Sequence, residues 1–131
     1  MRLLLDTHIA LWAVAAPEKL SAEARDLIDD GANQIIVSAV TIWEIGIKRA
    51  LGRRGLGAMP IGAADALAYF RAAEFDILDV SAAHAVAVEA LPPLHADPFD
   101  RILVAQALTE PLRLLTRDPK VAAYSDTIIL A

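Results

Sequence analysis

Short apolar segments with strand-like composition alternate with helix-like segments along the whole chain. The strand-like segments are rich in Leu, Ile and Val, and they occupy residues 2–5, 35–37, 76–80, 112–116 and 127–130. Helix-like segments lie between them, at residues 8–15, 21–30, 39–51, 63–73, 82–90 and 99–109. Parallel neighbouring strands need long, usually helical connections, so this order predicts an α/β sandwich with a parallel sheet and right-handed crossovers.

The length and composition are those of one globular domain. The chain has 131 residues, which predicts a single domain over residues 1–131 with its own core. It holds no cysteine, which excludes disulfides, thiolate catalysis and Cys-ligated zinc and fits a reducing cytoplasm. The apolar stretch of residues 3–16 contains Asp6 and His8 and is too short to span a bilayer, so we expect no membrane association.

The net charge of −5 argues against a protein that coats nucleic acid, because such proteins are usually basic. It does not argue against an enzyme whose acids hold a cation, since a bound metal ion reverses the local sign of the charge. The positions of the acids therefore matter more than their total.

Four acids lie where expected strands end or expected helices begin. Asp6 follows the first strand, and Asp118 follows the strand at residues 112–116. Glu44 and Asp100 lie in helices that start after a strand or a Pro-rich turn. Ligands of open parallel sheets bind at the carboxyl ends of the strands, so we expect these four side chains at one rim.

Most of these acids also fit an ordinary structural role as helix caps. Asp97, Pro98 and Asp100 match an N-cap, a Pro at the first helical position and an acid at the third, a pattern worth about 1 kcal/mol. Asp118 precedes Pro119 in the same way, and Asp6 precedes the first helix-like segment. Capping by itself therefore accounts for each of them when they are taken singly.

Glu44 fits this ordinary account least well. It has an i,i+4 partner in Lys48, and such a surface pair is worth a few tenths of a kcal/mol. However, its neighbours at helical spacing are Val40, Ile47 and Leu51, so it borders the apolar stripe of its helix. A carboxylate in that position needs a partner or a cation.

The four acids taken together indicate a metal centre. Two carboxylates about 4 Å apart repel each other by roughly 4 kcal/mol at an effective dielectric constant of 20, so converging acids either keep protons or share a cation. Oxygen ligands without Cys or paired His residues favour Mg²⁺ or Mn²⁺. Such a centre suits phosphodiester hydrolysis, in which the metal activates water and neutralises charge on the phosphate.

Four segments of the chain resemble PIN-domain ribonucleases of the VapC type, the toxins of type II toxin–antitoxin pairs. These segments are LLLDTHIALW, SAVTIWEIGIKRALG, LPPLHADPFDRILVAQAL and LLTRDPKVAAY. The resemblance covers nearly the whole chain in order. It implies a three-layer α/β/α sandwich around a twisted, parallel, five-stranded sheet.

The resemblance also implies roles for individual acids. It carries the family's metal ligands over to Asp6, Asp100 and Glu44, with Asp118 assisting through water or through a second metal ion. One or two Mg²⁺ or Mn²⁺ ions are implied. Asp97 is extra to the pattern, and we interpret it mainly as a cap.

The implied activity is that of a metal-dependent endoribonuclease, which cleaves RNA by attack of metal-activated water. The implied partners are an RNA substrate and a small VapB-like antitoxin that lies in an apolar groove of the early helices. A homodimer is also expected.

Other polar and aromatic residues have open interpretations. Thr7 and Thr116 adjoin the expected site and fit a hydrogen bond to a carboxylate or to a phosphate. His8, His84 and His95 lack a paired ligand spacing and are not expected to bind metal, although His95 lies near enough to the rim to contact substrate. Trp12 and Trp43 are expected in the core or in dimer packing. The cations that fit phosphate contact or a solvated helix end are Lys48, Arg49, Arg53 and Arg54. Arg101 and Arg117 each lie beside a predicted ligand and fit either contact with the scissile phosphate or a pair with an acid.

Other functional classes compete with this one. A receiver-type signalling domain also combines a parallel sheet, acids and Mg²⁺, but it needs an adjacent acid pair after the first strand, where this chain has Asp6, Thr7 and His8. A haloacid-dehalogenase-like phosphatase needs Asp-x-Asp there, and position 8 is His. A nuclease-inactive PIN-fold module that binds RNA or protein stays open.

Overall fold

The centre of the molecule is a five-stranded parallel sheet. The computed structural model describes residues 1–52 and 59–131. The strands pair in the order β3-β2-β1-β4-β5, and every pairing is parallel. Their bounds are β1 Arg2–Leu5, β2 Gln34–Ser38, β3 Asp76–Leu78, β4 Arg113–Thr116 and β5 Ile129–Leu130. The predicted α/β fold with a five-stranded parallel sheet is confirmed.

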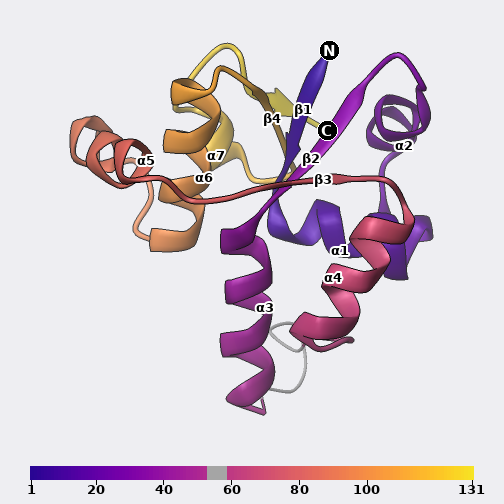
Figure 1. The fold of residues 1–131 in the computed structure, drawn as a ribbon. Helices are drawn as coiled ribbons and strands as arrows, with labels where there is room; N and C mark the ends of the chain where they lie inside the picture. Colours follow the sequence, from indigo (N-terminus) through magenta and orange to yellow (C-terminus); the bar gives the residue numbers. More distant parts are fainter. Residues whose placement is uncertain (53–58) are drawn as a thin grey trace.

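Helices connect the strands and cover both faces of the sheet (Figure 1). Within the part of the chain that the structure describes, two short 3₁₀ helices, Pro17–Lys19 and Val88–Ala90, follow α1 and α5. The segment expected as one helix at residues 82–90 is thus an α-helix followed by a tighter turn. The α-helices are α1 Thr7–Ala15, α2 Ala22–Asp29, α3 Ala39–Ala50, α4 Ala63–Ala72, α5 Ala82–Ala87, α6 Pro98–Thr109 and α7 Pro119–Ala122.

The order of the strands fixes where a site forms. The chain moves outward from β1 to β2 and β3, and then returns to the other side of β1 with β4 and β5. The switch point therefore lies between β1 and β4, where the connections diverge and leave a crevice at the carboxyl ends. Receiver domains have the order 2-1-3-4-5, so the receiver interpretation is wrong for this chain.

Alternate residues of β1 face opposite layers of the sandwich, because side chains of a strand alternate between the two faces. Leu3 and Leu5 pack into a cluster with residues of α1 and α4, such as Ile9 and Phe70. Leu4 packs into the other cluster with residues of β4, α6 and α7. The sheet therefore has a core on each face, as the three-layer prediction requires.

Aspartates and serines start the helices that follow the strands. The side chain of Asp6 accepts a hydrogen bond from the N–H of Thr7 at the start of α1, and Ser38 caps α3. Asp97 caps α6, and Asp118 caps α7. The predicted caps are confirmed, and they place acidic side chains at helix starts along the carboxyl edge of the sheet.

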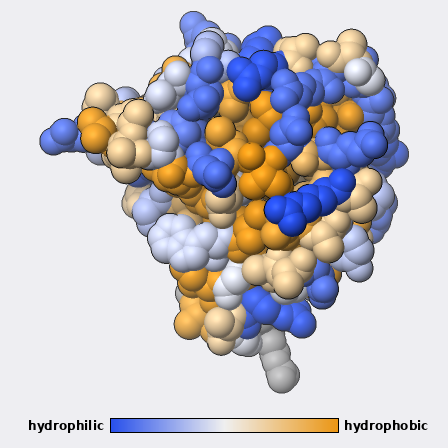
Figure 2. Space-filling view, in the orientation of Figure 1, coloured by the Kyte–Doolittle hydropathy of each residue, from blue (hydrophilic) through white to orange (hydrophobic). Residues whose placement is uncertain are grey.

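The surface in the orientation of Figure 1 is mixed. The space-filling view shows hydrophobic residues gathered in the middle of this face, with hydrophilic residues around and between them (Figure 2). Within residues 1–52 and 59–131, no helix is both long enough and apolar enough to cross a membrane.

We expect the Leu4→Ala variant to lower the free energy of unfolding by about 2–5 kcal/mol, because it removes a fully buried side chain and leaves a cavity. Urea denaturation followed by circular dichroism measures this change. Leu108→Ala is the matched control, because Leu108 lies on α6 and is 44% exposed. Equal denaturation midpoints for the two variants would contradict the two-core description.

Candidate metal centre

A cavity of about 580 Å³ opens at the carboxyl edge of the sheet. All four predicted carboxylates line it: Asp6 from the end of β1, Glu44 from α3, Asp100 from the first turn of α6 and Asp118 from the end of β4. Asp97 lines it as well. The structure therefore brings together residues that are up to 112 positions apart in the sequence.

Two hydrogen-bond donors hold the carboxylate of Asp6, one at the start of α1 and one at the end of β4. One carboxylate oxygen accepts a 2.6 Å hydrogen bond from the backbone N–H of Thr7, and the other accepts one of 2.6 Å from the hydroxyl of Thr116. The Thr116 hydroxyl oxygen also accepts the N–H of Asp118 at 3.1 Å. Burial nevertheless raises the pKa of Asp6 above its ordinary value of 3.8, because the loss of solvation outweighs these hydrogen bonds.

Glu44 is buried, at 3% exposure, and both of its oxygens have partners. Oε1 accepts a 2.9 Å hydrogen bond from the hydroxyl of Thr7, which is itself 3.2 Å from the hydroxyl of Thr41. Oε2 lies 2.6 Å from Nζ of Lys48. The i,i+4 pair predicted from the sequence is therefore present, but it offsets the charge of a buried carboxylate instead of lying freely on the surface.

The sequence left open whether the hydroxyls of Thr7 and Thr116 bind a carboxylate or a phosphate. Both threonines are buried, at 1% and 0% exposure, and both hydroxyls donate to carboxylates. In this structure they orient Glu44 and Asp6, and neither threonine is among the residues that line the cavity.

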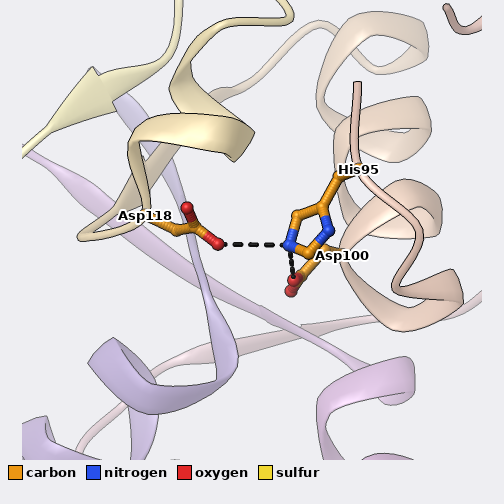
Figure 3. Close-up of side chains that lie close together, drawn as sticks. All are labelled: His95, Asp100 and Asp118. Carbon is orange, nitrogen blue, oxygen red and sulfur yellow. Dashed lines mark hydrogen bonds and ion pairs between the residues drawn. The ribbon is translucent and has the colours of Figure 1, made fainter. Parts of the chain in front are cut away.

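His95 lies between the two remaining carboxylates (Figure 3). Its Nε2 is 2.9 Å from Oδ2 of Asp100 and 3.1 Å from Oδ2 of Asp118. Among the described residues, these three side chains form the one group with ligand atoms within 4.8 Å of one another. The tightest ligand group is thus not the set of Asp6, Asp100 and Glu44 that the resemblance ranks first.

Sequence reasoning did not count His95 as a ligand because it has no second histidine at metal-binding spacing. The signal that points to it is its place in the turn before the cap of α6, two residues ahead of Asp97. That turn is held at the rim because the hydroxyl of Tyr124 accepts the backbone N–H of His95 at 2.9 Å.

Asp97 acts as the cap that we predicted. Its Oδ1 accepts the N–H of Phe99 at 2.8 Å and that of Asp100 at 3.3 Å. It also lines the cavity, so its charge adds to the negative field around Asp100.

The negative charge of the cavity disfavours the ionised form of Asp100. Burial, and then the carboxylates of Asp6, Asp97, Glu44 and Asp118, raise the pKa of Asp100 from 3.8 to about 8. The donor set of carboxylate oxygens with one imidazole nitrogen fits a divalent ion such as Mg²⁺ or Mn²⁺. The residues that fit as its ligands are Asp6, Glu44, Asp100, Asp118 and His95.

Two of the predicted cations line this cavity. Lys48 pairs with Glu44, and the guanidinium of Arg117 lies over the ring of Trp12, 5.1 Å from its centroid. Such a stack holds the cation at the wall of the cavity. Trp43, by contrast, is 62% exposed and is not a core residue.

The other predicted cations have different places. Arg49 donates to the backbone oxygen of Met59 and is absent from the residues lining the cavity. Arg101 donates to the backbone oxygens of Val88, Leu91 and Pro92 and to the hydroxyl of Tyr124, so it holds the turn before α6 instead of an acid or a phosphate. Arg53 and Arg54 lie outside the described residues.

Comparisons with known proteins agree with this geometry. The family model described as "PIN domain" matches residues 3–126. The chain belongs to the PIN domain family. It is 31% identical to "Ribonuclease VapC22" of Mycobacterium tuberculosis (strain ATCC 25618 / H37Rv) over 121 residues, which cover 92% of this chain and 90% of that protein.

Solved structures have the same PIN fold at lower identity. VapBC2 from Rickettsia felis, bound to a DNA fragment from its promoter, matches with a TM-score of 0.66 and 18% identity over 100% of this chain and 98% of that one. A toxin–antitoxin complex from Klebsiella pneumoniae matches with a TM-score of 0.62 and 21% identity over 97% and 95%. DNA-bound VapBC from Salmonella typhimurium matches with a TM-score of 0.64 and 13% identity over 100% and 97%.

The raised pKa of Asp100 predicts how the stability of the metal-free PIN domain changes with pH. Between pH 4 and 8 the folded state holds a proton that the unfolded state has lost, so the free energy of unfolding falls as pH rises through this window. Asp100→Asn removes this group. In EDTA at pH 8 we expect the variant to be more stable than the wild type by on the order of 2 kcal/mol, and by less at pH 5.

Urea denaturation at the two pH values measures this difference. Asp126→Asn is the control, because Asp126 is exposed and does not line the cavity. A stability difference between Asp100→Asn and the wild type that is the same at pH 5 and pH 8 would show that the acids do not interact as described.

Proposed function

We propose that this chain is a divalent-metal-dependent endoribonuclease, acting as the toxin of a toxin–antitoxin pair. The observation that carries the proposal is the cavity at the switch point, where Asp6, Glu44, Asp100 and Asp118 converge from four separate elements. A relative that is named a ribonuclease, and that the alignment covers to 90%, supports the choice of RNA as substrate. The absence of cysteine and an RNA substrate both favour the cytoplasm as its place of action.

The four carboxylates are the proposed ligands of Mg²⁺ or Mn²⁺. When bound, the ion supplies a Lewis acid that lowers the pKa of water and neutralises charge on the phosphate. The chain's own residues prepare the site: Thr116 orients Asp6, and Thr7 together with Lys48 orients Glu44. Arg117, held on Trp12 at the cavity wall, offers a cation to the phosphate backbone of the substrate.

We expect Asp100→Asn to abolish cleavage of RNA while the fold stays intact, because the variant removes one ligand charge and changes no buried apolar group. The measurement is single-turnover cleavage of a labelled RNA with added Mg²⁺ or Mn²⁺, together with circular dichroism of each protein. EDTA should stop cleavage by the wild type. Asp126→Asn should cut at the wild-type rate.

This assay also separates the enzyme from a nuclease-inactive binding module with the same fold. A module of that kind would bind RNA with and without metal but would leave it intact. Cleavage by Asp100→Asn at the wild-type rate would instead refute the assignment of the site while leaving the activity in place.

The proposed protein partners are an antitoxin and a second copy of the chain. The solved structures with this fold include several toxin–antitoxin complexes. We expected the antitoxin in a groove of the early helices. A largely apolar cavity of about 530 Å³ lies between α3, α5 and α6, away from α1 and α2. Exposed Trp43 packs edge-to-face on Phe99 there. This apolar surface is the candidate contact for a partner.

We expect the chain to co-purify from its native cells with a small protein that blocks RNA cleavage, and to sediment as more than a monomer. Analytical ultracentrifugation and mass spectrometry of the purified material measure both properties. A free monomer that cuts RNA as isolated would count against the toxin–antitoxin assignment and leave the nuclease assignment standing.

A further inference from the structure

His95 occupies the position that joins two of the acids of the cavity. Asp100 and Asp118 come from different elements, α6 and the turn after β4, and their Oδ2 atoms both face the same ring nitrogen. The close-up shows the imidazole between the two carboxylates, with Nε2 directed at both (Figure 3). The ring is partly exposed, at 18%, so it lies at the cavity wall and not in the core.

The spacing of these atoms is that of adjacent ligands on one ion. In an octahedral site with metal–ligand bonds of about 2.1 Å, neighbouring ligand atoms are about 3.0 Å apart. The two distances from Nε2 are 2.9 and 3.1 Å. An ion at this position would therefore require small shifts of side chains that are already directed toward one another.

We propose that His95 is a metal ligand of this chain, binding through Nε2 together with Asp100 and Asp118, and that it makes this half of the centre prefer Mn²⁺ to Mg²⁺. The inference rests on the proposed metal-dependent function and names a ligand that the four-acid pattern lacks. Mg²⁺ is a hard ion that favours oxygen, whereas imidazole nitrogen suits transition metals. The half formed by Asp6 and Glu44 offers only oxygen and keeps its hydroxyl donors.

Metal binding at Nε2 of His95 requires the proton on that nitrogen to move. In the metal-free protein Nδ1 accepts the N–H of Asp97 at 3.4 Å, so the ring carries its proton on Nε2 and donates it to the carboxylates. When an ion takes the place of that proton, the neutral ring carries its single proton on Nδ1 instead, and any proton that Asp100 holds in the metal-free protein is released to solvent. The ring gives up the Nε2–H contacts to the two carboxylates, which the ion replaces, and the long hydrogen bond from Asp97. The backbone N–H of His95 still donates to the hydroxyl of Tyr124, so the turn keeps its place.

The test is pulsed electron paramagnetic resonance of Mn²⁺ bound to the full chain. We expect a nitrogen hyperfine coupling in the wild type, which changes to the ¹⁵N pattern when all histidines are ¹⁵N-labelled. The coupling should disappear in His95→Ala. The coupling should persist in His8→Ala. This variant is the matched control, because His8 is the other histidine that lines the cavity.

Competition titrations of the same proteins with Mn²⁺ and Mg²⁺ give a second readout. We expect His95→Ala to weaken Mn²⁺ binding at least about ten-fold and Mg²⁺ binding by less, so that the preference for Mn²⁺ shrinks. If His95→Ala folds poorly, the inference is still tested by ¹⁵N-labelled His8→Ala, in which the histidine coupling should remain because His95 is then the histidine left at the cavity.

The outcomes separate this inference from the proposed function. If Mn²⁺ binds and RNA is cut but no histidine coupling appears, His95 is not a ligand and the nuclease proposal stands. A coupling that survives in His95→Ala, or an unchanged ratio of Mn²⁺ to Mg²⁺ affinity, also overturns the inference. If neither ion binds and no RNA is cut, both proposals fail.

Discussion

The mutual repulsion of the carboxylates at the carboxyl edge of the sheet is the main physical constraint on this structure. Asp6 and Asp100 both have raised pKa values, because burial and neighbouring negative charge disfavour their ionised forms. The fold tolerates this arrangement through fixed donors: backbone N–H groups, the hydroxyls of Thr7 and Thr116, and the ammonium of Lys48. A divalent cation is the one partner that would relieve all of the acids at once.

The structural and functional roles of these acids are not alternatives, because a carboxylate has two oxygens. Asp118 uses Oδ1 to cap α7 through the N–H of Lys120 and directs Oδ2 at His95. Asp6 uses Oδ1 for the N–H of Thr7 and Oδ2 for the hydroxyl of Thr116. In Asp118 the cap therefore fixes one oxygen and leaves the other directed at His95, which lines the cavity.

Local patterns predicted the elements well and the contacts between them less well. Asp97 and Pro98 identified the start of α6, and Glu44 stood out because it bordered an apolar stripe. The roles of His95 and Arg101 were harder to predict, because each depends on a turn whose path is set by residues distant in the sequence. Arg101 seemed a partner for an acid or a phosphate, but it holds the carbonyls of the turn that carries His95.

The sequence by itself determined the alternation of strands and helices, the caps and the four acids, because these follow from residue type and short-range spacing. Only the tertiary structure decided that β1 lies between β2 and β4, and therefore that Thr116 reaches Asp6 across 110 positions. It also decided that His95 meets Asp100 and Asp118 and that the apolar groove lies beside α5. Strand order and loop paths depend on packing of the whole chain, and contacts a few ångströms long between remote residues have no local signature.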